Sequence, residues 1–365
     1  MSNTTDDLLR IYKEQEEEFL KSLKSVNVLL LGQTGVGKST LINTIFGEEL
    51  AKVSDVKPET RGFWKYKVKD KPVTIIDSEG YELDKSDEFI SVLDAEVQKR
   101  FNDINSQIHI AWYCISISSG RVLPYDISNI GFLAKKRIPT AVVLTQCDND
   151  TPNGDTAKAM SAVITKNFGS SIKTFQVCND KAINDEIGDL DSLMKWSEEN
   201  INDDNLKCSF AIAQRANLEL KYDKVASRIK WYAAAAATIG AVPIPIADAI
   251  PLTALQVKMT CDIFKIYGID SSLSDVIKGA IGSKVVSMMA KSLVKFIPIV
   301  GSIVNATVAA TITWSMGYSI NKIAKKMVTA AWNGALPEEI TDMLSSENID
   351  RYIDEYQKSG KKETI

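Results

Sequence analysis

A nine-residue segment near the start of the chain limits the fold more than any other feature. Residues 32–40 read Gly-Gln-Thr-Gly-Val-Gly-Lys-Ser-Thr, which satisfies every fixed position of the pattern G-x-x-x-x-G-K-[ST]. The apolar run 26–31 before it is typical of a buried strand, and residues 38–46 have the apolar spacing of a helix. The segment therefore joins a strand to a helix N-terminus, where free N–H groups and the helix dipole bind phosphate.

The residue types in this loop predict distinct tasks in phosphate binding. Its glycines let the backbone curl around an anion. Lys38 is expected to reach the β- and γ-phosphate oxygens, and the Ser39 hydroxyl is expected to bind Mg²⁺. The loop residues expected to bind nucleotide are Gly32, Thr34, Gly35, Val36, Gly37, Lys38, Ser39 and Thr40.

Cysteine and histidine usage excludes several classes of site. The five cysteines are scattered without a C-x-x-C pair, so neither a disulfide framework nor a zinc site is indicated. His109 is the single histidine and lies in an apolar run, which disfavours a Ser-His-Asp triad.

The N-terminus is polar and acidic, unlike a signal peptide, so a cytoplasmic protein is expected.

Residues 26–202 alternate between strand-like and helix-like segments. Strands are expected at 26–31, 62–69, 72–77, 108–116, 139–145 and 172–178. Helices are expected near 38–46, 86–104, 124–136, 155–168 and 189–200. This alternation predicts an α/β fold with a mostly parallel sheet and helices on both faces. In such sheets ligands bind at the carboxyl ends of the strands.

Helical patterns alone follow the α/β region. Helices are expected at 204–238, 252–267, 271–293, 300–332 and 337–358. Residues 5–24 also show amphipathic helical spacing. We therefore predict an N-terminal helix over 1–25, a nucleotide-binding domain over 26–202 and an all-α helical domain over 203–365.

The helical region carries two signals for an anionic membrane surface. Residues 204–335 hold 15 Lys+Arg against 7 Asp+Glu, and residues 296–321 contain no charge. The uncharged run is long enough to span a bilayer, but its Gly, Ser and Thr residues equally suit close packing in a helical core. Peripheral binding, insertion and a buried core with a basic solvent face all remain open.

Two further segments predict contacts to Mg²⁺ and the γ-phosphate. Thr60 lies between the first helix and the second strand, where its hydroxyl would bind Mg²⁺ and its amide the γ-phosphate. The alternative is a threonine that merely enters a strand. Asp77 and Gly80 form a D-x-x-G motif at the end of the third strand. The Asp77 carboxylate is expected near Mg²⁺ and the Gly80 amide at the γ-phosphate.

The strand at 139–145 ends in a segment that selects the base. Thr145-Gln146-Cys147-Asp148 resembles the box [NT]-K-x-D, whose Asp accepts hydrogen bonds from guanine N1–H and the 2-amino group. Adenine supplies neither donor, so the buried acceptor would be left unpaired. Gln146 replaces the usual Lys and would lie over the base without its charge. After the last strand, Cys178 and Asn179 stand where the Asn179 amide would contact guanine O6.

These motifs, in this order, resemble the translation-factor-like (Era/TrmE) branch of Ras-like P-loop GTPases over residues 26–202. Residues 109–115 with Arg121 look like a bacterial subgroup that carries a C-terminal domain of unknown function 697, and residues 244–248 and 255–259 are similar to that region. The resemblance implies GTP and GDP as ligands, Mg²⁺ as cofactor and association with membranes in many members. The helical half is also loosely similar to immunity-related and dynamin-like GTPases.

Catalysis is assigned to Lys38, Thr60 and Gly80, with Ser39, Thr60 and Asp77 as metal ligands. The residue after Gly80 is Tyr81 rather than a water-positioning glutamine, so slow intrinsic hydrolysis is expected. A homodimer partner, an activating protein or a potassium ion would complete the site, with Arg61 and Arg121 as candidate arginine fingers.

The sequence thus favours a GTPase switch coupled to a helical effector domain. The alternative is a membrane-associated scaffold in which nucleotide drives self-assembly. Nucleic acid is not an expected partner, since no recognisable RNA-binding module follows the G domain.

Overall fold

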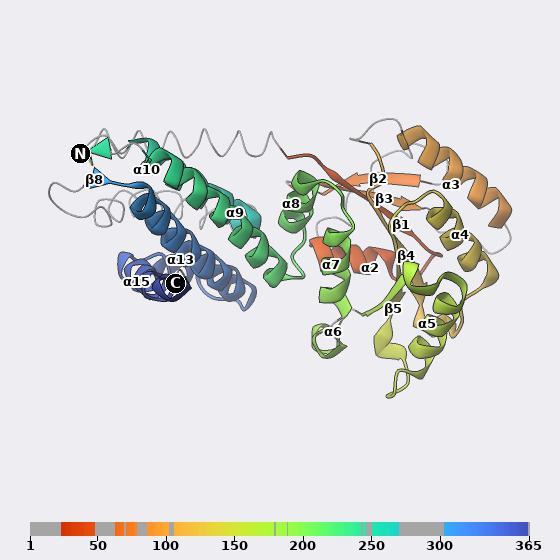
Figure 1. Cartoon of the computed structure of the whole chain (residues 1–365). Coiled ribbons are helices and arrows are strands. Elements are labelled where there is room, and N and C mark those ends of the chain that lie inside the picture. The colour runs from red at the N-terminus through yellow and green to blue at the C-terminus, as the bar shows by residue number, and fades with distance from the viewer. Residues whose placement is uncertain are drawn as a thin grey trace. The chain divides into compact units, whose positions relative to one another are not determined.

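The computed structural model divides the chain into two compact units, Leu23–Asn217 and Leu218–Ile365. It describes residues 23–47, 63–68, 71–78, 86–101, 106–178, 180–187, 189–241, 244–245, 250–269 and 303–363. Figure 1 shows the elements of both units. The N-terminal helix predicted over 5–24 and the helix predicted over 271–293 lie outside the described residues.

The first unit is a six-stranded sheet in the order β2-β3-β1-β4-β5-β6. Its strands are β1 (Val26–Leu31), β2 (Phe63–Lys67), β3 (Val73–Ser78), β4 (Ile110–Ser116), β5 (Thr140–Thr145) and β6 (Lys173–Val177). β2 runs antiparallel to β3, and the other neighbours pair in parallel. Every residue of β1, β4 and β5 is buried, as expected for strands covered on both faces. The predicted Ras-like α/β fold is confirmed.

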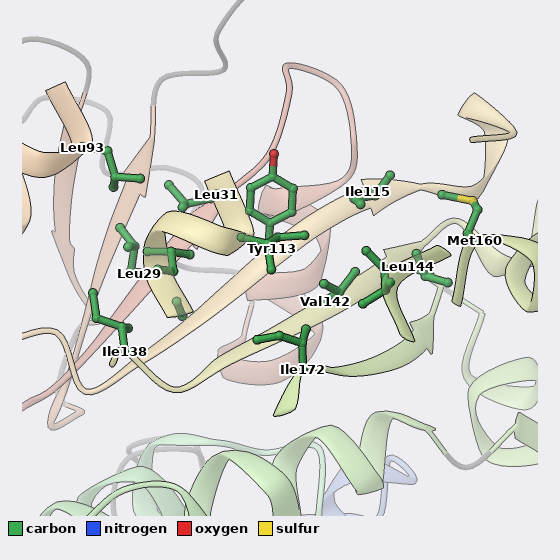
Figure 2. Packing of buried hydrophobic residues seen from close by; sticks show 14 of the residues in the cluster. Leu29, Leu31, Leu93, Tyr113, Ile115, Ile138, Val142, Leu144, Met160 and Ile172 are labelled. Carbon is green, nitrogen blue, oxygen red and sulfur yellow. The ribbon is translucent and has the colours of Figure 1, made fainter. Parts of the chain in front are cut away.

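One face of the sheet is covered by α3 (Ser86–Phe101), α4 (Pro124–Lys135) and α5 (Asp155–Phe168). Figure 2 shows the apolar side chains of this face, with Leu29 and Leu31 from β1 beside Tyr113 and Ile115 from β4. Tyr113 also donates a hydrogen bond from its hydroxyl to Asp126 Oδ1 in α4, at 2.8 Å. That polar contact fixes how α4 sits on the sheet.

The opposite face holds an aromatic cluster built from three elements. Trp112 of β4 stacks on Phe46 of α2 (Lys38–Phe46), with ring centroids 6.0 Å apart. Phe210 of α8 (Asp204–Ala213) meets both rings edge-on at 6.4 Å and is fully buried. α6 (Lys181–Ile187) and α7 (Asp189–Glu199) contact β6. Residues 203–217, which the sequence analysis grouped with the helical domain, thus pack in the first unit.

The single helix predicted over 204–238 is wrong, because the chain leaves α8 at Gln214 and re-enters a helix at Leu218. Gln214 Nε2 donates to Asn217 O at 2.9 Å, and Asn217 N donates to Gln214 Oε1 at 2.8 Å. This reciprocal pair satisfies the buried polar groups of a sharp turn. The turn contains neither Gly nor Pro, the residues from which turns are usually predicted.

The second unit consists of helices and one short ribbon. The helices are α9 (Leu218–Ile239), α10 (Ile250–Tyr267), α13 (Ala306–Trp332), α14 (Pro337–Asp342) and α15 (Ser346–Glu363). β7 (Ile244–Pro245) pairs antiparallel with β8 (Ile303–Val304). α9, α10 and α13 contact one another, and α15 packs on α13. The helical class predicted for this region is confirmed, although the helix predicted over 337–358 is broken into α14 and α15.

Buried polar bonds fix how α10 and α13 meet. Tyr267 of α10 donates from its hydroxyl to Asn321 Oδ1 of α13 at 2.7 Å, and Gln256 Nε2 donates to Thr313 Oγ1 at 3.1 Å. Thr313 and Asn321 belong to the uncharged run 296–321 and are fully buried. The described part of that run therefore lies in a helix–helix contact that buried hydrogen bonds hold in place. No helix in the described ranges is long and apolar enough to cross a membrane.

Gly→Ala should change the free energy of unfolding in opposite directions at two helical glycines, one in α13 and one in α4. A Cβ on Gly317 would lie 2.8 Å from Ile229 Cγ1 and 3.0 Å from Met259 Sδ, whereas one on Gly131 would lie 3.7 Å from Phe168 Cε1. Gly317→Ala should lower the free energy of unfolding by about 1–3 kcal/mol through overpacking. Gly131→Ala should raise it by about 0.5–1 kcal/mol through helix propensity. Chemical denaturation of both variants measures these changes. If both substitutions lowered, or both raised, the free energy of unfolding, the close contact of α9, α10 and α13 would be contradicted.

Candidate functional site

The phosphate loop leaves β1 through a space that only glycine fits. Gly32 has φ 141°, and a Cβ there would lie 2.4 Å from the Cys114 carbonyl oxygen of the neighbouring strand β4. Gly35 and Gly37 follow with φ 80° and 88°, in the left-handed region that other residues rarely adopt. The three predicted glycines thus shape the loop directly ahead of α2.

Lys38 is folded back over the loop that precedes it. Its Nζ donates to the carbonyl oxygens of Gly32 at 2.8 Å and Gln33 at 3.0 Å. The side chain is buried, and burial lowers the pKa of the ammonium, although the charge of Asp77 opposes the shift. The ammonium is therefore held next to the loop, where phosphate oxygens would replace the two carbonyls.

Asp77 lies beside the entry to the loop because β3 pairs with β1 in the register Leu30 to Asp77. Burial raises the pKa of its carboxyl to about 6, and the Lys38 charge only partly offsets this. Asp77 Oδ1 and Ser78 Oγ are buried and find no hydrogen-bond partner in the described part of the chain. A buried oxygen without a donor costs free energy unless a ligand satisfies it.

That orphaned carboxylate oxygen suits a hard divalent cation such as Mg²⁺, which binds one or two carboxylates together with phosphate oxygens. Ser39 and Thr40 are exposed in the first turn of α2, at the same end of β1. The described ranges contain no group of three His, Cys, Asp or Glu side chains that would hold a metal by itself. Asp77 and Ser39 are thus the described candidates for binding a divalent cation.

The base-selective segment is tied to the phosphate loop by side chains. Thr145 at the end of β5 donates from Oγ1 to the Val36 carbonyl oxygen, and Gln146 Nε2 lies 3.4 Å from Gly35 O. Gln146 turns the chain with φ 58°, so that Asp148 follows in the short helix η4 (Cys147–Asn149). Asp148 is exposed and accepts no hydrogen bond within the described ranges. Its carboxylate is therefore available to a ligand.

Two serines that sequence reasoning missed orient Gln146. Ser116 Oγ and Ser118 Oγ donate to Gln146 Oε1 at 2.6 and 3.0 Å. Both follow from the end of β4, so the rule that ligands bind at carboxyl ends of strands would have pointed to them. Because two donors hold the oxygen, the amide NH₂ must face the phosphate loop. The structure thus supplies a neutral, fixed group where the usual motif has lysine.

A buried amide also holds Cys178 at the end of β6. Asn184 Oδ1 accepts from Cys178 N at 3.0 Å, and Asn184 Nδ2 donates to Cys178 O at 2.8 Å. The Cys178 thiol lies against Cys147 of the base segment, where burial, with a smaller contribution from the Cys178 thiol, raises the pKa of Cys147 to about 12. The contact between the two thiols thus joins the ends of β5 and β6. Sequence reasoning also missed Asn184.

Several predicted site residues lie outside the described residues, namely Thr60, Arg61, Gly80 and Asn179, as does Tyr81. Arg121 is described and exposed in the connection between β4 and α4. The structure therefore brings together the phosphate loop, Asp77 and the base segment at one edge of the sheet. The roles of the remaining candidates stay predictions.

Because the pKa of Asp77 is raised, removing its charge should increase the free energy of unfolding by an amount that depends on pH. The Asp77 carboxyl has a pKa of about 6 in the folded protein and 3.8 in the unfolded chain. The free energy of unfolding therefore falls as pH rises between these two values. Asp77→Asn should therefore raise the free energy of unfolding of the nucleotide-free protein at neutral pH by about 1–3 kcal/mol. The gain should narrow as pH falls from about 6 towards 4.

Urea unfolding followed by intrinsic tryptophan fluorescence measures this effect, with Asp148→Asn at an exposed position as the matched control. A gain that is independent of pH would show that the buried charge is not its source.

Comparisons with known proteins agree with this arrangement. A sequence model of the family described as "50S ribosome-binding GTPase" matches residues 27–146. The probable GTP-binding protein EngB of Aquifex aeolicus (strain VF5) is 30% identical over 137 residues, which cover 37% of this chain and 73% of EngB. GTPase Der of Campylobacter jejuni (strain RM1221) is 28% identical over 184 residues, which cover 49% of this chain and 35% of Der.

Among solved structures, the crystal structure of a probable GTP-binding protein engB is 18% identical, with a TM-score of 0.34, and covers 48% of this chain and 98% of that one. The matched sequence holds the phosphate loop, β3 with Asp77 and the first two residues of the base-selective segment, Thr145 and Gln146. The chain therefore belongs to the P-loop GTPases of the bacterial EngB, Der and Era type, which bind guanine nucleotides.

Proposed function

We propose that the chain is a molecular switch that hydrolyses GTP to GDP with Mg²⁺ and transmits the nucleotide state to its helical unit. The observation that carries this proposal is the cradle in which Thr145 and Gln146 bond to the carbonyls of Val36 and Gly35. Because the base segment and the phosphate loop are one hydrogen-bonded body, base and phosphates are bound in fixed register. Preorganised contacts of this kind are the main protein contribution to phosphoryl transfer.

The phosphate end of the cradle uses Lys38, Ser39 and Asp77. Lys38 exchanges its two loop carbonyls for β- and γ-phosphate oxygens, where its charge opposes the charge that develops in the transition state. The Ser39 hydroxyl and the Asp77 carboxylate would hold Mg²⁺, which would neutralise phosphate charge when bound. Thr60 joins them as the third metal ligand in the proposal.

The base end uses Asp148 for guanine and Gln146 for stacking. Asp148 accepts from N1–H and the 2-amino group, and Gln146 is held over the base by Ser116 and Ser118. Asn184 holds both the N–H and the carbonyl of Cys178. The amide of the next residue, Asn179, is proposed to contact guanine O6.

Hydrolysis is proposed to be slow in the isolated chain, with Lys38, Thr60 and the Gly80 amide as the catalytic groups. Tyr81 follows Gly80, so the chain supplies no glutamine there to orient water. A homodimer partner, an activating protein or a potassium ion completes the site in this proposal. Arg121 is exposed near α4 and is the described candidate for an arginine finger.

The assignment to the Era/TrmE branch and the resemblance of the second unit to domain of unknown function 697 belong to the same proposal. Association with anionic membranes, and a scaffold driven by nucleotide, rest on the basic composition of residues 204–335. Three lysines flanking the uncharged run already have partners: Lys322 pairs with Glu355 at 3.0 Å, Lys325 with Glu219, and Lys326 with the Tyr352 hydroxyl. These contacts weaken the membrane alternative, and vesicle flotation with GDP and a non-hydrolysable GTP analogue tests it.

Guanine selectivity should reside in Asp148. Asp148→Asn should weaken GTP binding about 10- to 100-fold and improve xanthosine triphosphate binding, because the amide presents donors where the carboxylate accepted. Titration of labelled nucleotides measures both constants. Lys38→Ala is the matched control, since it should weaken both nucleotides without changing their ratio. Equal affinity of the native chain for GTP and ATP would refute the assignment.

The boundary of the nucleotide-binding unit should decide whether a fragment folds. A fragment that ends at Asn217 retains α8, so it should bind GTP as the full chain does. A fragment that ends at Asn202 loses Phe210 from the Phe46–Trp112 cluster and should unfold at lower temperature, since removing a buried Phe costs about 3–5 kcal/mol. Thermal melts and GTP titrations of both fragments provide the test. A 1–202 fragment as stable as 1–217 would place α8 outside the folding unit.

A further inference from the structure

A pocket of about 580 Å³ lies at the edge of the sheet opposite to the phosphate loop. It opens where β4 and β5 begin, since His109 and Pro139 line it directly before these strands. The C-terminal turns of α3 and α4 and the N-terminus of α8 complete the wall. Its size falls within the range of about 300–1,000 Å³ that is usual for ligand sites. Nothing in the GTPase assignment uses this pocket.

The lining of the pocket has an apolar floor and an aromatic rim. Ile108, Ile138 and Leu206 are buried in the floor. Phe101, by contrast, is 66% exposed on the wall from α3. An exposed aromatic ring over an apolar floor is the composition of a protein-binding hot spot, in which one side chain of a partner is buried.

The rim carries more positive than negative charge: Arg100, Lys135, Lys136 and Arg137 line it together with one carboxylate, Asp203, which caps α8 and lies 3.9 Å from Lys24. Arg100 pairs with Glu96, and Lys136 pairs with Asp94 at 2.6 Å. Lys135 and Arg137 are exposed and form no ion pair within the ranges that the structure describes. Two cations therefore remain for an incoming acidic group, beside an apolar floor.

Helix stability does not account for Arg137. Cations in the last turn of a helix interact favourably with its dipole, which explains Lys135 in α4. Arg137 instead lies beyond the C-cap Lys136 with φ 58°, a left-handed conformation that favours glycine. An arginine in this place gives up backbone stability and contributes a charge to the pocket rim.

We propose that this pocket is a docking site for an acidic peptide segment of a partner protein, with an aromatic or aliphatic side chain that enters the apolar floor beside Phe101. Lys135 and Arg137 bind the carboxylates that flank this anchor. The site lies at the opposite edge of the sheet from the nucleotide, so a partner bound there leaves the nucleotide cradle accessible.

Charge balance favours a peptide over nucleic acid. Residues 23–217 carry 23 Lys+Arg against 27 Asp+Glu, so the unit as a whole repels a polyanion. Two free cations around an enclosed apolar floor suit a short segment with few carboxylates, whereas a phosphate backbone needs an extended basic face.

Selection of random phage-displayed peptides on the full chain, followed by fluorescence titration of the enriched sequences, tests the proposal. Enriched peptides should combine Asp or Glu with an aromatic or large aliphatic residue. Lys135→Glu/Arg137→Glu should weaken them about tenfold or more, and Phe101→Ala should also weaken them. The matched control Lys166→Glu/Lys173→Glu reverses two exposed lysines outside the pocket and should leave the affinity unchanged.

Arg137→Gly separates binding from folding. It should raise the melting temperature, because it relieves the left-handed strain, and still weaken the peptide. All variants should retain native GTP affinity. Failure to enrich acidic peptides, equal affinity in the native chain and the double charge reversal, or single-stranded RNA that binds through Lys135 and Arg137 in place of peptides would each overturn the proposal.

Discussion

The close approach of Gly32 to the Cys114 carbonyl is the constraint on which the nucleotide site depends. At 2.4 Å from that oxygen, no Cβ fits, so the chain turns out of the sheet between β1 and β4 only if residue 32 is glycine. The turn sets where the phosphate loop begins, and Lys38 then folds back onto the carbonyls of Gly32 and Gln33. Because β3 pairs with β1 in register, the same turn also places Asp77 at the loop. One backbone contact thus positions the phosphate loop, its cation and its carboxylate.

The site keeps its charges in an environment that opposes them. Burial lowers the pKa of Lys38 and raises that of Asp77, and their mutual attraction offsets each shift only in part. A fold selected for stability alone would replace such a pair by apolar side chains, since desolvation commonly exceeds the Coulombic gain. Fixed charges that are poorly solvated before the ligand arrives interact strongly with phosphate and metal afterwards. In the proposed function, phosphate and metal would satisfy the charges of Lys38 and Asp77 that burial disfavours.

Sequence reasoning found the elements whose signals are local. The continuous apolar runs of β1, β4 and β5 were readable because both faces of these strands are buried, and the phosphate loop was readable because its glycines are adjacent in sequence. It missed contacts that join distant residues, such as Ser116 with Gln146 or Asn184 with Cys178. It also missed the break after α8, because Gln214 and Asn217 close that turn by hydrogen bonds, without the usual Gly or Pro. The pocket beside Phe101 has no motif, since its walls come from helix ends and strand starts.

The sheet separates the two sites while it connects them covalently. β1 runs from the pocket edge, where Asn27 N donates to His109 Nδ1 at 2.8 Å, to Gly32 at the phosphate loop. Six residues of strand span about 20 Å. Every side chain of β1 is buried, so its neighbours hold it in a single packing arrangement and any shift along the strand would disturb both faces of the sheet. A strand held in this way acts as a rigid spacer. Communication between nucleotide and partner would then require movement of the surrounding helices, which end at the pocket, rather than of the sheet itself.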